Sequence, residues 1–376
     1  MDTKTTIRAI TLVILFILSG MGPGVYAQST ADKVDVFIKT EMRTRSIPGL
    51  QMAVIQHGQI VKTGNYGLAN VEFSVPVTDS TVFSINSITK AFTGVAIMQL
   101  VEEGKVNIEA PVSQYLDSLP LAWQKVTIRQ LMGHVSGLPD VTDTLTDELV
   151  SKKGEDSAWI KVKSLPLFFP PGERFNYNTT NYLLLGKIID KLSGQPFVRF
   201  IQHKQLEVVN MQQTTFGNSF DVMPRKAPTY TYYHRNDKGE FVKQHHLMQT
   251  YEEFPAFLLT DAGMFSTARE LARWIMALQQ GKLLKDKKSI HTMWTPVRLN
   301  NGTLDGFGGI LNGYALGWPV VDRPRHPAVA PIGGGRASLF IYPQDDVSII
   351  ILTNLTGCSP ESLVEGVAKY YVGGLN

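Results

Sequence analysis

Cysteine is almost absent from this sequence: Cys358 is the only one in 376 residues. A single thiol cannot form an internal disulfide, so no disulfide framework stabilises the chain. The residues before it, Ile-Ile-Leu-Thr-Asn-Leu-Thr-Gly, are mostly apolar. They predict a buried, structural cysteine.

A charge excess of one sign is also missing. The 36 Lys and Arg residues nearly balance the 33 Asp and Glu residues, for a formal net charge of +3, and the basic residues do not cluster. This gives no electrostatic basis for binding nucleic acid. Hydrophobic residues make up 43% of the chain and the mean hydropathy is −0.03, as expected for a globular protein with a large core.

No apolar run is long enough to be a good membrane span, and the one near the N-terminus is short. Residues 9–18 are apolar apart from Thr11, and Lys4 and Arg8 precede them. Val25-Tyr-Ala27 supplies small residues for a signal peptidase. We therefore expect residues 1–27 to be a signal peptide cleaved before Gln28. The protein would then be exported, periplasmic or secreted, without a stable membrane span. A retained N-terminal anchor is the alternative.

Periodic apolar residues predict the main elements. We expect helices over residues 31–42, 87–104, 181–192, 266–280 and 360–371, and strands over 50–56, 59–66, 338–342 and 347–354. Strands therefore lie near both chain ends. This favours an α+β fold in which residues 28–125 and 256–376 form an antiparallel sheet flanked by helices, and residues 126–255 form a mostly helical region.

Ser87 and Lys90 lie at the start of the second predicted helix, in Phe83-Ser-Ile-Asn-Ser-Ile-Thr-Lys90. Residues three apart share one helix face, so the lysine can reach the serine hydroxyl. A serine beside a group that takes its proton is an activated nucleophile. The spacing is also a frequent coincidence, so it needs support from other residues.

Two other segments offer that support. Tyr177 lies in a polar loop just before a predicted helix; near a lysine ammonium its proton becomes easier to lose, although a packed tyrosine is the alternative. Residues 333–335 are three glycines before a strand. They allow the backbone to approach a substrate closely, as an oxyanion donor must, although an ordinary turn has the same composition.

Several motifs in order along the chain resemble the serine β-lactamase and penicillin-binding-protein superfamily. They are Ile47-Pro-Gly-Leu50, the Ser87 segment, Thr127-Ile-Arg-Gln-Leu-Met-Gly-His-Val-Ser-Gly-Leu-Pro139, Asp261-Ala-Gly-Met-Phe-Ser-Thr-Ala268 and Tyr314-Ala-Leu-Gly-Trp318. The resemblance is to the branch with class C β-lactamases, D-alanyl-D-alanine carboxypeptidases, D-aminopeptidases and β-lactamase-fold esterases. It implies a serine hydrolase that forms an acyl-enzyme without a cofactor or metal, on a small-molecule or peptide substrate. The oligomeric state does not follow from it.

The resemblance also implies roles for single residues. Ser87 would be acylated, Lys90 would be its proton partner, and Tyr177 would carry the proton to and from the leaving group. The oxyanion donors would be the backbone N–H groups of Ser87 and Gly334. The residues expected around the substrate are Gly333, Thr179 and Arg336.

Two positions depart from the family's motifs. Thr179 takes the place of the asparagine in Y-x-N, although Asn178 and Asn181 are close. Pro331 takes the place of the basic residue in K-T-G or H-x-G, so the usual contact with a substrate carboxylate is lost unless Arg336, Arg325 or His326 replaces it. A D-amino-acid peptide or a small ester is then a better substrate than a β-lactam, and a non-catalytic binding or scaffold protein is the alternative.

Histidines give weaker signals. His134 lies in a Gly-His-Val-Ser-Gly turn and is expected to be structural rather than a general base. The adjacent His245 and His246 lack the spacing of a zinc site.

Overall fold

The computed structural model describes residues 29–143, 148–236 and 239–375. The predicted signal peptide lies outside this part of the chain. Among the described helices, none combines the length and the apolar character needed to cross a membrane.

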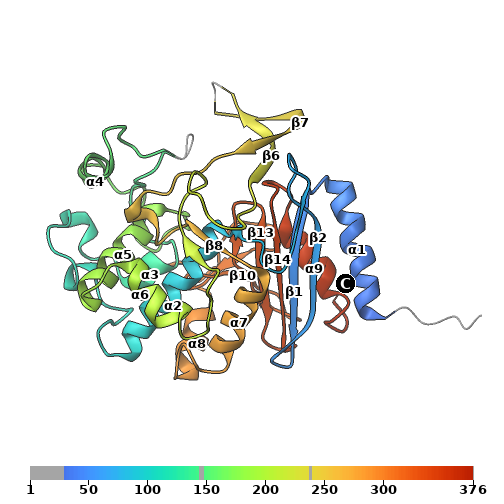
Figure 1. Cartoon of the computed structure of the whole chain (residues 1–376). Coiled ribbons are helices and arrows are strands. Elements are labelled where there is room, and N and C mark those ends of the chain that lie inside the picture. Colours follow the sequence, from blue (N-terminus) through green and yellow to red (C-terminus); the bar gives the residue numbers. More distant parts are fainter. Residues whose placement is uncertain (1–28, 144–147, 237–238, 376) are drawn as a thin grey trace, which may run out of the picture.

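A nine-stranded antiparallel sheet lies at the centre of the structure, and both chain ends contribute to it (Figure 1). The order across the sheet is β3-β2-β1-β14-β13-β11-β10-β9, and β12 pairs with β13. The first strand of the chain lies beside the last, with Ala53 opposite Ile350. The α+β fold expected from the sequence is therefore confirmed. The strands of this sheet are β1 (Gly49–Gln56), β2 (Gln59–Asn70), β3 (Val75–Pro76), β9 (Gly313–Tyr314), β10 (Pro319–Val321), β11 (Ala328–Val329), β12 (Ile332–Gly333), β13 (Ala337–Tyr342) and β14 (Val347–Thr353).

The two terminal helices, α1 (Thr30–Arg45) and α9 (Pro360–Ala368), pack together on one face of the sheet (Figure 1). Helix α1 begins at a capping box, in which the Ser29 side chain accepts from the Asp32 backbone and the Asp32 side chain accepts in return. On the other face, α7 (Ala268–Gln279) contacts β1 and β14.

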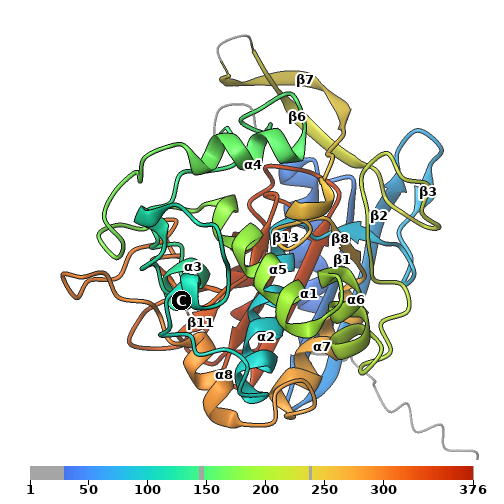
Figure 2. The ribbon, with the colours of Figure 1, turned by 90° about the vertical axis from the view of Figure 1, so that its left-hand side faces the viewer.

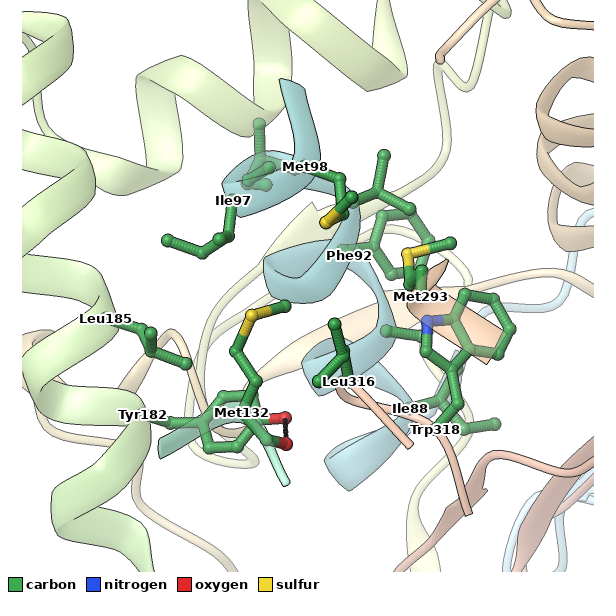
Figure 3. Packing of buried hydrophobic residues seen from close by; sticks show 14 of the residues in the cluster. Ile88, Phe92, Ile97, Met98, Met132, Tyr182, Leu185, Met293, Leu316 and Trp318 are labelled. Atoms are coloured by element: carbon green, nitrogen blue, oxygen red, sulfur yellow. Dashed lines mark hydrogen bonds between the residues drawn. The ribbon is translucent and has the colours of Figure 1, made fainter. Parts of the chain in front are cut away.

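Helix α2 (Thr89–Glu102) is the central helix of the molecule, and every side chain from Thr89 to Leu100 is buried. A helix that is apolar on all sides must be enclosed by other elements. Helices α5 (Thr179–Ser193), α6 (Phe197–Ile201) and α8 (Lys287–Trp294) surround it. Figure 3 shows side chains of α2 packed between Tyr182 of α5 and Met293 of α8. The N-terminus of α2 is thereby fixed in position.

The middle of the chain contains more strand than we expected. Besides α3 (Ile128–Met132), α4 (Glu155–Lys163), α5 and α6, it has a hairpin of β6 (Thr229–Arg235) and β7 (Phe241–Thr250) that projects from the body (Figures 1 and 2). Strand β5 (Thr215–Phe216) forms a small sheet with β4 (Phe83–Ser84) and β8 (Met264–Ser266). The run Thr-Tyr-Thr-Tyr-Tyr in β6 is aromatic and β-branched, as is typical of a strand, and we did not predict this strand from the sequence.

Candidate active site

We expected Ser87 to lie in the first turn of an α-helix. It lies instead in the 3₁₀ turn η1 (Asn86–Ile88), which leads into α2. Asn86 has a φ of +46°, a left-handed conformation that is uncommon for a residue other than glycine. The Ile85 N–H donates to the Met264 carbonyl of β8 over 3.0 Å, which ties the turn to the small sheet. The turn leaves Ser87 partly exposed at the start of a buried helix.

Lys90 is next to the serine, and its side chain is only 1% exposed. Its Nζ donates to Ser87 Oγ over 3.3 Å and to the backbone carbonyl of Asp261 over 3.1 Å, and it forms an ion pair with the Asp261 carboxylate. The Tyr177 ring centroid is 4.4 Å from the same nitrogen. The structure thus brings Ser87, Lys90 and Tyr177 together, and it adds Asp261.

Burial raises the pKa of Tyr177 well above its usual value, and the negative charge of Asp261 raises it further. A hydrogen bond with the Ser87 side chain opposes this shift only in part. We expected the lysine ammonium to make the Tyr177 proton easier to lose; burial and the Asp261 carboxylate outweigh that effect. Tyr177 therefore carries its proton in the resting site and is suited to donate it.

Gly333, at the end of β12, lies directly against the turn that carries Ser87. A Cβ atom at Gly333 would overlap the Ile85 carbonyl oxygen and lie 3.1 Å from the Ser87 nitrogen. Gly334 and Gly335 follow with φ of +55° and +60°. This is the close approach of backbone to nucleophile that an oxyanion site requires.

Arg336 lies inside the protein rather than facing a substrate. Its side chain is 1% exposed and forms an ion pair with Glu252, and it donates to the hydroxyls of Ser84 and Thr356 over 3.0 Å each. These contacts tie the residue before β13 to β4 and to the segment after β14, and they occupy the guanidinium. This is contrary to the expectation that Arg336 contacts the substrate.

Neither of the other basic residues considered near Pro331 replaces the lost lysine or histidine. His326 Nδ1 lies 2.9 Å from the Asp345 carboxylate, in the turn after β13. Arg325 lies against Gly374, near the C-terminus. The structure thus gives no basic partner for a substrate carboxylate among the three.

Thr179 is the first residue of α5, and its hydroxyl accepts a hydrogen bond from Thr142 Oγ1 over 3.3 Å. Its two asparagine neighbours are buried. Asn178 caps α5, and Asn181 Oδ1 accepts from the Ser136 hydroxyl over 2.5 Å. Both amides therefore stabilise the scaffold, and neither replaces the asparagine of the family's motif.

His134 is fully buried, and its Nδ1 accepts a hydrogen bond from the Asn178 N–H over 3.1 Å. Burial lowers its pKa well below the usual value, and the positive charge of Lys90 lowers it further. The neutral ring packs on Tyr177, with centroids 4.4 Å apart, and so supports the loop before α5. This is the structural role that the sequence predicted for His134.

Two residues near the nucleophile were not identified from the sequence. Asp261 was noted only as part of a motif, and 171 positions separate it from Lys90. Phe307 lies on a loop between α8 and β9, is 42% exposed, and has its ring centroid 4.9 Å from that of Tyr177. In the described ranges, no group of three or more His, Cys, Asp or Glu side chains is arranged to hold a metal ion.

The chain has relatives among known proteins. A model of the Beta-lactamase family matches residues 34–366. Protein flp of Staphylococcus aureus (strain MRSA252) is 24% identical over 341 residues, which cover 89% of this chain but only 64% of that protein. Penicillin-binding protein 4* of Bacillus subtilis (strain 168) is 29% identical over 309 residues, 79% of this chain and 66% of that protein.

Solved structures show the same fold. The octameric penicillin-binding protein homologue from Pyrococcus abyssi superposes with a TM-score of 0.71 at 26% identity, over 88% of this chain and 75% of that one. The penicillin binding protein from Bacillus halodurans gives 0.68 at 22% identity, over 88% and 98%. The chain belongs to the Beta-lactamase family, which carries a serine hydrolase or acyl-transferase kind of function.

Proposed function

We propose that this chain is an exported serine hydrolase that forms an acyl-enzyme on Ser87 and prefers a small uncharged ester. The observation that carries the proposal is the contact of Ser87 with both Lys90 and Tyr177. The position of the basic residue in the family's K-T-G or H-x-G motif is taken by the uncharged Pro331. The attacking groups are complete, whereas the usual anchor for a substrate carboxylate is missing.

In the first half of the reaction, Ser87 Oγ attacks the ester carbonyl carbon and passes its proton to Lys90 in the neutral amine form. The backbone N–H groups of Ser87 and Gly334 stabilise the oxyanion. The bond to the leaving oxygen then breaks, and Tyr177 donates its proton to that oxygen. The proton on Lys90 restores the tyrosine.

In the second half, water attacks the acyl carbon and transfers a proton through the same groups. The bond to Ser87 Oγ breaks, the serine regains its hydrogen, and a carboxylic acid leaves. None of these steps needs a cofactor.

The side chains beside Tyr177 favour an apolar leaving group. Phe307 and Phe175 pack on each other with ring centroids 5.6 Å apart, and the exposed Phe307 ring also contacts Tyr177. An apolar alcohol held there would lie next to the phenol that protonates it. A D-amino-acid peptide is the alternative substrate, and a non-catalytic binding protein is the alternative function.

The test compares p-nitrophenyl butyrate with a chromogenic cephalosporin as substrates of the mature protein. We expect measurable ester hydrolysis and weak or no cephalosporin turnover, with Ser87→Ala as the control without the nucleophile. Brisk cephalosporin hydrolysis would overturn the interpretation of Pro331. If neither substrate is consumed and no acylating reagent modifies Ser87, the binding alternative is favoured.

A further inference from the structure

Asp261 contacts the Lys90 ammonium with two oxygens, one from its backbone carbonyl and one from its carboxylate. Its backbone carbonyl accepts from Nζ over 3.1 Å, and its carboxylate forms the ion pair. The carboxylate is 15% exposed, whereas Lys90 is almost fully enclosed. Asp261 lies in the segment between η5 (Ala256–Leu258) and β8, so the fold brings it to α2 from a distant part of the chain.

Burial and the carboxylate act on Lys90 in opposite directions. Removing an amine from water favours its neutral form, and a carboxylate in contact favours the charged ammonium. An ammonium has no lone pair, so it must lose a proton before it can accept the proton of Ser87. That loss would leave a neutral amine beside the Asp261 carboxylate, and the ion pair would be given up.

We propose that Asp261 is a positioning residue that keeps Lys90 charged at Ser87 and thereby sets the pH above which Lys90 accepts the serine proton. This rests on the proposed acylation of Ser87. It assigns to the carboxylate a task that the uncharged backbone carbonyl cannot perform.

The other titratable groups near this pair do not account for the same pH dependence. Burial keeps the neighbouring histidine neutral and the neighbouring tyrosines protonated, and the Asp140 carboxyl accepts hydrogen bonds from Thr142 and Thr179 instead of the lysine. These groups are His134, Asp140, Tyr177, Tyr182 and Tyr314.

The test is Asp261→Asn, which removes the charge but keeps the shape and the backbone acceptor. The rate of acylation by p-nitrophenyl butyrate is measured against pH across the range in which the protein is folded. We expect the midpoint of the rising limb to move to lower pH by about one unit or more, so that activity relative to the plateau rises roughly tenfold below the limb. In Asp261→Glu the midpoint should return toward its wild-type pH. Asp140 is a buried carboxyl without this ion pair, so Asp140→Asn should leave the midpoint unchanged.

A purely structural role for Asp261 predicts a different result. The Asp261→Asn profile would then be lowered by the same factor at every pH, with its midpoint unchanged, and the proposal would be overturned. If Asn does not allow folding, Asp261→Ser is measured in the same way.

A second readout does not depend on activity. In protein labelled with ¹³C-lysine, the Lys90 signal is identified by its loss in Lys90→Arg and is titrated in wild type and Asp261→Asn. A fall in the Lys90 midpoint in the variant supports the role of Asp261 even if Ser87 proves unreactive, and an unchanged midpoint contradicts it. Failure of acylation alone would instead contradict the proposed function.

Discussion

Ser87 and Lys90 differ in their exposure to solvent, and the difference suits their proposed tasks. Ser87 is partly exposed and open to a substrate, while Lys90 is enclosed and contacts Ser87, Asp261 and the Tyr177 ring. A charge held away from water acts strongly on its neighbours. Small changes at these side chains should therefore have large effects on the reaction.

Tyr177→Phe removes the phenol proton and keeps the ring that packs on His134. Because Tyr177 is protonated at rest, we expect the loss of hydrolysis rate in this variant to depend on how strongly the leaving group needs a proton. Hydrolysis of ethyl butyrate should fall by roughly 10²–10⁴-fold, the usual contribution of a general acid.

The better leaving group of p-nitrophenyl butyrate serves as the control in the same variant, because p-nitrophenolate needs no proton, and its loss should be much smaller. Steady-state rates on the two esters check this. An equal loss on both would contradict the role of Tyr177 as proton donor.

Burial raises the pKa of the Cys358 thiol from 9.0 to about 11. The reactive thiolate is therefore scarce in the folded protein at mildly alkaline pH. We expect no reaction of the native protein with a disulfide reagent such as dithionitrobenzoate, and one equivalent after unfolding in guanidinium. Rapid labelling of the native protein would contradict the buried position.

At this scale, the sequence predicted what is local. Ser87 and Lys90 are three residues apart, so their contact follows from helical geometry. Asp261 and Phe307 come to the site from distant segments, and no local pattern distinguishes them. Arg336 looked available because its partner, the partly buried Glu252, is 84 residues away.

Among the elements, the predictions are best where apolar periodicity is strong. Helices α1, α5, α7 and α9 and strands β1, β2, β13 and β14 all lie where the sequence placed them, with small shifts at their ends. The 3₁₀ turn before α2 was missed because contacts with β8 and β12 determine it. Its Asn86 conformation is uncommon and is the kind of feature found at functional sites.

Gly333→Ala tests the close approach of β12 to that turn. The added Cβ would collide with the Ile85 carbonyl, so the strand or the nucleophile turn must shift. We expect destabilisation by about 1–3 kcal/mol, typical of overpacking, and a large loss of acylation rate. Urea unfolding and burst kinetics measure the two effects.

Gly373→Ala is the matched control, since a Cβ there would meet no atom within 4 Å. It should change neither quantity appreciably. If Gly333→Ala behaved like this control, the contact between β12 and the turn would not be tight in solution.

In the whole molecule, the sheet joins the two chain ends and the site lies where the sheet meets the helical layer. Two apolar clusters hold these layers together, one between the sheet and the helices around α2, the other between the sheet and α1 and α9. The position of strands near both ends of the sequence was enough to predict the layers. The pairing of β1 with β14, and the register of that pairing, could not be predicted from the sequence, because both depend on contacts between residues almost a whole chain apart.

The central claim concerns Ser87, and intact-mass measurement tests it most directly. The mature protein is incubated with a fluorophosphonate probe, and Ser87→Ala is treated in parallel. We predict one covalent adduct on the wild-type chain, none on the variant, and a peptide map that places the adduct on Ser87. A wild-type chain that stays unmodified by the fluorophosphonate and by other acylating reagents, or an adduct that persists in Ser87→Ala, would contradict the account.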